Sequence, residues 1–140
     1  MSPANGPAIL YPMFALAALT VFVQLLIPLA RVRAGKRGEI KTDDFKFGES
    51  TSVPSQVSIP NRNYMNLLEF PVLLYVACLL AYVATQVSPS MLTLAWAFVS
   101  LRVAHSAIHL TYNRVSHRAL MFGMSNVALV LLWVQVAMHV

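Results

Sequence analysis

Residues 9–30 read ILYPMFALAALTVFVQLLIPLA, an apolar run in which Thr20 and Gln24 are the polar members. An α-helix needs about 20 mostly apolar residues to cross the hydrocarbon core of a bilayer, and this run meets that length. The run is too long for the apolar core of a signal peptide, and neither a preceding basic flank nor a small-residue cleavage site accompanies it. We therefore expect a retained transmembrane helix over 9–30.

Three further stretches have the same length and character. They predict helices over 62–87 (apolar from Asn66), 91–111 and 119–140. Of the 140 residues, 58% are hydrophobic and 11% are charged, whereas soluble domains carry about 25% charged residues. One small core cannot bury so much apolar surface. The sequence thus predicts a single all-α domain over 1–140, an integral membrane four-helix bundle, and argues against a soluble enzyme.

The links between the predicted helices differ in length. Ser88–Ser90 makes a tight turn, and 112–118 is a short polar link, so both join antiparallel neighbours. The link over 31–61 is the one long polar segment, and it holds four of the five acidic residues.

The basic residues decide the expected topology. The formal net charge is +5, from ten Lys and Arg against five acids, which by itself would suit nucleic acid or a membrane surface. Apart from Arg102, every basic residue lies in or beside 31–61 or in 112–118, and these alternate links fall on one face. The positive-inside rule then predicts a cytoplasmic loop over 31–61, with both termini outside. Membrane lipid, and no nucleic acid, is the expected partner.

Polar side chains form a stripe on the second predicted helix. Arg62, Asn66 and Glu69 are spaced i, i+4, i+7, so they share one helical face. An ionisable group at the edge of hydrocarbon costs a few kcal/mol and defaults to a functional or paired role. The alternative, a capped helix entrance with a snorkelling Arg62, does not account for Glu69.

The third predicted helix carries a second stripe, formed by Arg102, His105 and His109. Arg102 lies midway along its span and needs a partner, and Glu69 is the only acid outside the long loop. We therefore predict a Glu69–Arg102 ion pair between helices. Two imidazoles and a carboxylate could also hold zinc or iron, but the nearby arginines disfavour a divalent cation, so no metal is expected.

Arg118, at the start of the fourth predicted helix, completes a cationic polar pocket at the cytoplasmic edge. Arg114 beside it also fits simple interfacial anchoring. Several arginines, an amide, one carboxylate and two imidazoles suit a small ligand with carboxylates and an ammonium group.

These motifs resemble the MAPEG family, the membrane-associated proteins in eicosanoid and glutathione metabolism. The pattern Arg-x-x-x-Asn-x-x-Glu-x-Pro over 62–71 is similar to the family's second-helix signature. Arg-Val-Ala-His over 102–105, followed by His109, resembles the third helix of the prostaglandin E synthase branch. The loop text over 44–54 and 61–64 is similar to bacterial members, which implies a bacterial inner membrane.

The resemblance implies a homotrimer with glutathione as co-substrate, bound between neighbouring subunits near the cytoplasmic face. Arg118 matches the arginine that stabilises the glutathione thiolate, and Arg31 or Arg33 would reach the ligand from the adjacent subunit. The remaining positions carried over to the glutathione site are Arg62, Asn66, Glu69, His105 and His109, the last standing where relatives often have tyrosine.

Two departures leave the substrate open. Ala119 and Phe122 replace a serine and a tyrosine of the prostaglandin synthase branch, so that specific reaction is doubtful. We expect a glutathione-dependent transferase or peroxidase acting on small lipophilic electrophiles. The alternative is a non-catalytic member that binds a lipid or a partner protein. A transporter or channel subunit is disfavoured, because the charges cluster at one edge instead of lining a path across.

Overall fold

The computed structural model describes residues 5–139, and its regular elements there are all helical. Four stretches are long and apolar enough to cross a membrane, which confirms the four predicted spans. In chain order the elements are α1 (Asn5–Ala8), α2 (Leu10–Lys36), the short 3-10 helix η1 (Thr42–Phe45), α3 (Ser55–Leu68), α4 (Val72–Val83), α5 (Pro89–Leu110) and α6 (Val115–His139).

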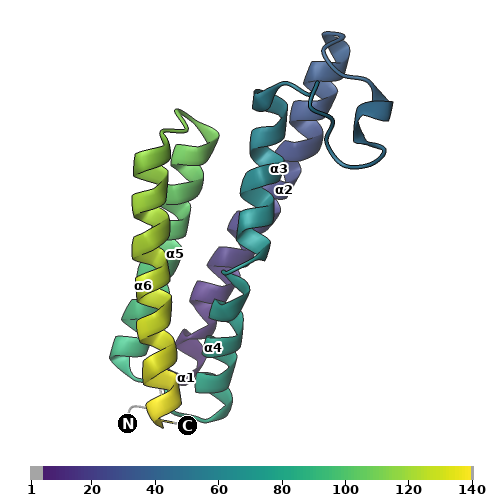
Figure 1. The fold of residues 1–140 in the computed structure, drawn as a ribbon. Helices are drawn as coiled ribbons and strands as arrows, with labels where there is room; N and C mark the ends of the chain where they lie inside the picture. The colour runs from purple at the N-terminus through teal and green to yellow at the C-terminus, as the bar shows by residue number, and fades with distance from the viewer. Residues whose placement is uncertain (1–4, 140) are drawn as a thin grey trace.

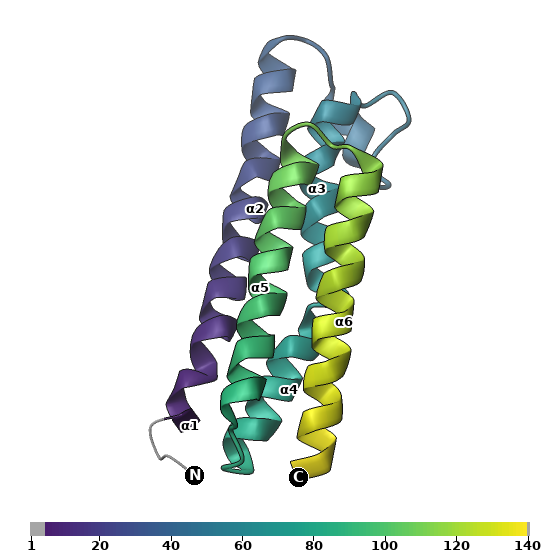
Figure 2. The same ribbon diagram turned by 90° about the vertical axis from the view of Figure 1, so that its left-hand side faces the viewer.

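The helices pack as two antiparallel pairs, α2 with α3 and α5 with α6 (Figures 1 and 2). The pairs converge near the termini, where α4 continues the line of α3, and they diverge toward the opposite end (Figure 1). Buried Leu16 of α2, Leu74 of α4, Phe98 of α5 and Leu129 of α6 belong to one hydrophobic core. The bundle is therefore tight at one end and leaves room for a polar site at the other.

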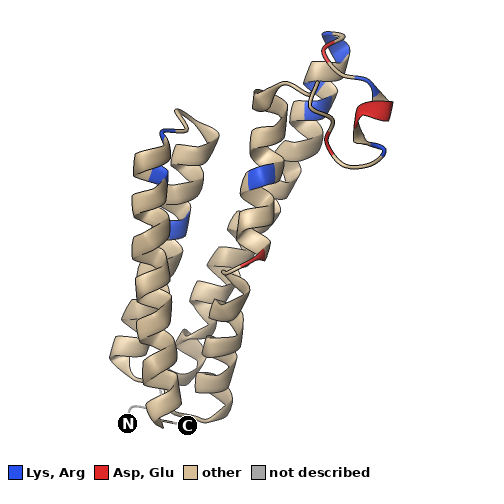
Figure 3. Cartoon of the chain, in the orientation of Figure 1, with Lys and Arg blue, Asp and Glu red and all other residues tan. Residues whose placement is uncertain are grey.

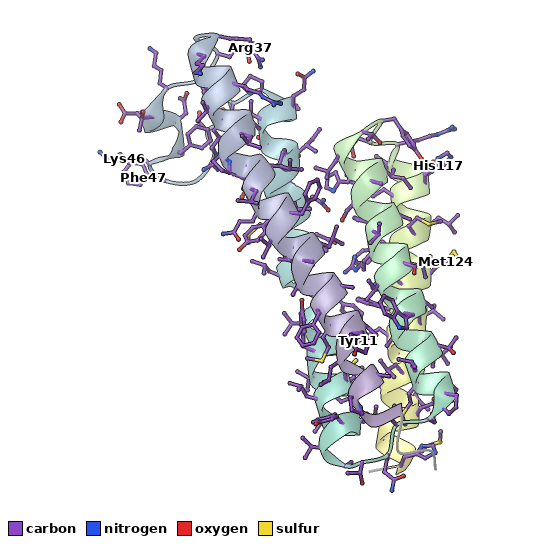
Figure 4. The ribbon with its side chains drawn as sticks, turned by 180° about the vertical axis from the view of Figure 1, so that it is seen from behind. Tyr11, Arg37, Lys46, Phe47, His117 and Met124 are labelled. Carbon is purple, nitrogen blue, oxygen red and sulfur yellow. The ribbon has the colours of Figure 1, made fainter. Side chains whose placement is uncertain are left out.

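Most of the apolar surface faces outward. Only 11% of the apolar window of the first span is buried, and Tyr11 on this span is 61% exposed. The side chain of Met124 on α6 projects away from the bundle (Figure 4). So much exposed apolar surface requires a lipid surrounding.

The second predicted helix is broken in the structure. The helical backbone ends at Leu68, and Glu69 has φ −83° and ψ −109°, outside the helical region. Pro71 causes the break, because it lacks an N–H for the Leu67 carbonyl and its ring crowds that carbonyl. Helix α4 then begins at Val72. The prediction of one helix over 62–87 is corrected to α3 and α4, together spanning Ser55–Val83.

The long polar link is shorter than predicted. Helix α2 continues to Lys36 and α3 begins at Ser55, so the loop is 37–54 instead of 31–61. Buried Val53 of the loop packs with Ala34 of α2 and Val57 of α3, and partly buried Phe45 covers this small cluster. Packing against α2 and α3 therefore extends both helices into residues that look loop-like in sequence.

The basic residues gather at one end of the molecule. Lys and Arg lie around the loop, on the adjoining part of α3 and near the α5–α6 turn, whereas the end with the termini is free of them among residues 5–139 (Figure 3). The bounds of the last two helices differ slightly from prediction: α5 begins at Pro89 and α6 begins at Val115. Residue 140 lies outside the described residues.

Candidate active site

A cavity opens between α3, α5 and α6 at the basic end of the bundle. Its volume is about 270 Å³, slightly below the usual range for ligand sites of about 300–1,000 Å³. Five of the eight predicted catalytic and binding residues line it. The lining residues are Arg62, Asn66, His105, His109, Val115, Arg118, Ala119 and Phe122.

Two hydrogen bonds join α3 to α5 behind this cavity. The Arg102 guanidinium donates to Asn66 Oδ1 at 2.9 Å, and the Ser106 hydroxyl donates to Asn63 Oδ1 at 3.3 Å. Asn63 and Ser106 are buried, and each bond satisfies polar groups that would be costly to leave unpaired in an apolar bundle. Two amide-centred bonds therefore set the relative position of the two helices.

The predicted Glu69–Arg102 ion pair does not form. The two ion pairs among residues 5–139 are Arg31–Glu49 and Arg37–Glu39. The helix break turns Glu69 out of the stripe that carries Asn66, and Glu69 is exposed. Asn66, one turn before the break, accepts a hydrogen bond from the Arg102 guanidinium instead. Glu69 is accordingly absent from the residues that line the cavity.

His105 is fixed by the backbone of α6. Its Nδ1 lies 3.0 Å from the Arg118 carbonyl oxygen, and because a carbonyl can only accept, Nδ1 carries the hydrogen. In the neutral ring this leaves Nε2 with a free lone pair. The rings of His105 and His109 meet edge to face at 5.9 Å between centroids. His109 Nδ1 is buried and has no hydrogen-bond partner within the described chain.

Arg118 is held by the turn between α5 and α6. Its Nη1 donates to Asn113 Oδ1 at 2.8 Å. Asn113 has φ 47°, a left-handed conformation that asparagine tolerates better than most side chains. The turn thus serves both to reverse the chain and to present an acceptor that holds the guanidinium at the cavity.

Arg31 and Arg33, which were predicted to reach the site from the end of the first span, lie away from the cavity. Arg31 pairs with Glu49 at 3.3 Å and its guanidinium lies 4.2 Å from the Phe45 ring centroid, so it anchors the loop. Arg33 lines a separate groove of about 400 Å³ between α2, α3 and the end of α5. Within one chain, neither residue reaches the cavity.

Three residues that support the site are not among those predicted from the sequence. Asn113 could have been suspected from an amide in a short link before a helix, and Ser106 from its i+4 spacing to Arg102 on the polar stripe. Phe98 had no such signal: its ring centroid lies 5.4 Å from the Arg102 guanidinium carbon, with Phe122 at 5.0 Å on α6.

The chemistry of the cavity is that of an anion receptor. Arg62 and Arg118 supply charged N–H donors, which bind carboxylates strongly, and His105 Nε2 supplies an acceptor. Within residues 5–139 no three His, Cys, Asp or Glu side chains gather as a metal site would require. Ala119 and Phe122 make one wall apolar, so a nonpolar reactant could lie beside a bound anion.

The comparisons with known proteins agree with this architecture. Residues 9–138 match the sequence model of the MAPEG family, which is nearly the whole chain. No curated protein and no solved structure matches it. The MAPEG family consists of membrane-bundle proteins of glutathione and eicosanoid metabolism, and the four apolar helices described above fit that architecture. This chain is an integral, multi-pass membrane protein that belongs to the MAPEG family.

Proposed function

We propose that the protein is a glutathione-dependent transferase or peroxidase that acts on lipophilic electrophiles from the bilayer. The observation that carries this proposal is the cavity at the basic end, in which Arg62 and Asn66 of α3 and Arg118 of α6 line the same space. A receptor for a small anion, with an apolar wall open to lipid, is what such a reaction needs.

The donors in the cavity fit glutathione. The tripeptide has two carboxylates, which Arg62 and Asn66 can bind, and a thiol between them for Arg118. Free thiols have a pKa of about 8.5 and are mostly protonated at neutral pH, although only the thiolate is nucleophilic. A guanidinium within hydrogen-bond reach favours the anion, and more strongly in a water-poor site than in water. The hydrogen bond from Arg118 to Asn113 keeps this cation in place before the ligand arrives.

The reaction then follows from ordinary thiolate chemistry. The thiol proton leaves to water at the open mouth of the cavity, and the sulfur attacks an electrophilic carbon. The new C–S bond forms as the leaving group departs with its electron pair. With a hydroperoxide, two thiols are oxidised to the disulfide, while the peroxide is reduced to an alcohol and water. Phe122 and Ala119 would contact the apolar part of the second substrate.

The assembly and orientation are part of the same proposal. The cavity of one chain is small for a tripeptide, and a homotrimer would enlarge it by adding Arg31 or Arg33 from a neighbouring copy. The cluster of basic residues at the loop end (Figure 3) supports a cytoplasmic loop, with both termini outside, in a bacterial inner membrane. Glu69 would bind the ammonium group of glutathione across this interface.

A non-catalytic role is the second candidate. It is favoured by Ala119 and Phe122, which give the cavity wall no hydroxyl donor beside the reacting sulfur. Such a protein would bind a lipid or a partner protein in the same place.

Thiolate absorbance separates the two candidates. The purified protein with glutathione at neutral pH should show the ultraviolet band of a thiolate, and it should conjugate a chlorodinitrobenzene electrophile. Arg118→Ala should lose both, whereas Arg114→Ala, exposed and outside the cavity lining, should keep both. Absence of the thiolate band from the wild-type protein would reject the enzyme and leave the binding role.

A further inference from the structure

Arg102 is a buried cation without a carboxylate partner. It is 0% exposed, and its Nε and Nη2 have no hydrogen-bond partner among the described residues. Among residues 5–139, the one side-chain hydrogen bond of Arg102 goes to Asn66 Oδ1. The rings of Phe98 and Phe122 lie near the guanidinium and confine it.

This bond fixes which way the Asn66 amide faces. A guanidinium has only donors, so the oxygen of the amide must face Arg102. Asn66 also lines the cavity, and no side-chain hydrogen bond within residues 5–139 uses its nitrogen. The NH2 group is therefore left as a donor on the cavity side. Without Arg102 the amide could turn over, and an acceptor would face the ligand instead.

We infer that Arg102 is a positioning residue, which holds the Asn66 amide so that its N–H groups face the cavity and bind an acceptor oxygen of the ligand. The inference rests on the proposed function, and with glutathione the acceptor is a carboxylate or a peptide carbonyl. Arg102 itself does not line the cavity, so it acts only through Asn66.

If the bond between Arg102 and Asn66 were merely structural, an aspartate at position 66 would serve at least as well as the asparagine. A buried arginine without a counterion is costly, and a carboxylate beside it would offset that cost. An aspartate has nearly the same shape as asparagine, so it could pair with Arg102 more strongly. It would, however, present only acceptors to the cavity and would repel an anionic ligand. Stability and ligand binding therefore respond in opposite directions to Asn66→Asp.

The experiment compares Asn66→Asp with the wild-type protein in detergent. We expect the melting temperature to rise and the affinity for glutathione, measured by titration calorimetry, to fall about ten-fold or more. The matched control is Asn61→Asp on the same helix, outside the cavity lining, which should change neither quantity much. Arg102→Met, which keeps much of the bulk but has no donor, should also weaken glutathione binding. Because both residues act through one contact, the double variant should lose less affinity than the sum of the losses in the two single variants.

Two outcomes would overturn the inference. If Asn66→Asp melts at a higher temperature and binds glutathione with wild-type affinity, the bond is only structural. Asn66→Asp that does not melt higher would show that position 66 does not face the guanidinium. The melting readout needs no ligand, so it tests the contact even if wild-type protein fails to bind glutathione, a result that would reject the proposed function itself.

Discussion

The hydrogen bond from Arg118 to Asn113 offers a test of how the candidate catalytic arginine is held. Asn113→Gly removes the acceptor and keeps a residue that adopts φ 47° freely. Asn113→Ala removes the acceptor and adds the strain of a left-handed alanine, about 1 kcal/mol. The two variants therefore separate the effect of the bond from the effect of the turn.

The magnitude follows from the geometry. The Nη1–Oδ1 distance is 2.8 Å and the pair is partly buried. Hydrogen bonds to charged groups contribute about 1.5–3 kcal/mol when buried, and partial exposure reduces this to about 1 kcal/mol. Since 1.4 kcal/mol is ten-fold, releasing Arg118 should weaken glutathione binding about five-fold.

Titration calorimetry and thermal melts check both parts. The Gly and Ala variants should lose the same affinity, and the Ala variant should melt at a lower temperature than the Gly variant because it adds the backbone strain. Ser116→Ala, exposed in the first turn of α6, serves as control. Wild-type affinity in both Asn113 variants would refute the idea that the turn holds the arginine.

Three further predictions concern residues outside the cavity. Thr85, a β-branched residue with φ 55°, is strained, so Thr85→Gly should raise the free energy of unfolding by about 1 kcal/mol in chemical denaturation. The hydrogen bonds from Arg37 hold the pKa of Glu39 below its ordinary 4.5. The resulting stabilisation is present above pH 4.5 and is lost as the pH falls through the lowered pKa. Arg37→Met should raise the pKa of Glu39, as measured by carboxyl NMR titration. Glu49→Gln should lower stability by about 0.5–1 kcal/mol by removing the partly exposed pair with Arg31, and added salt should shrink that difference in melting experiments.

The spans were predictable from sequence because the bilayer imposes a simple rule of length and hydropathy. The polar stripe on α5 was predictable because charged and polar side chains stand out within an apolar span. Arg102, His105 and His109 indeed share one buried face. Length and hydropathy were enough to find the spans, and helical spacing was enough to find the stripe.

The partners of those residues could not be predicted in the same way. Pro71 was visible in the sequence, but the turning of Glu69 out of its stripe depends on how the chain leaves the broken helix. Arg102 then donates a hydrogen bond to Asn66 on α3. Opposite charge suggested Glu69 as the partner of Arg102, whereas the packing of the helices places Asn66 within hydrogen-bond distance.

The loop boundaries were also beyond the reach of composition. Residues 31–36 are rich in basic side chains yet continue α2 as a helix. Their order comes from tertiary contacts, since Ala34 packs on Val53 and Val57. Helices in proteins owe more stability to packing than to local propensity.

The most direct measurement is the affinity of the purified protein for glutathione, determined by titration calorimetry in detergent. The account predicts saturable binding by the wild-type protein and at least ten-fold weaker binding by Arg118→Ala. It also predicts unchanged binding by Gln135→Ala, whose residue lines a hollow at the opposite end. No saturable binding by the wild-type protein, or equal binding by Arg118→Ala, would contradict the claim that this cavity is a glutathione site.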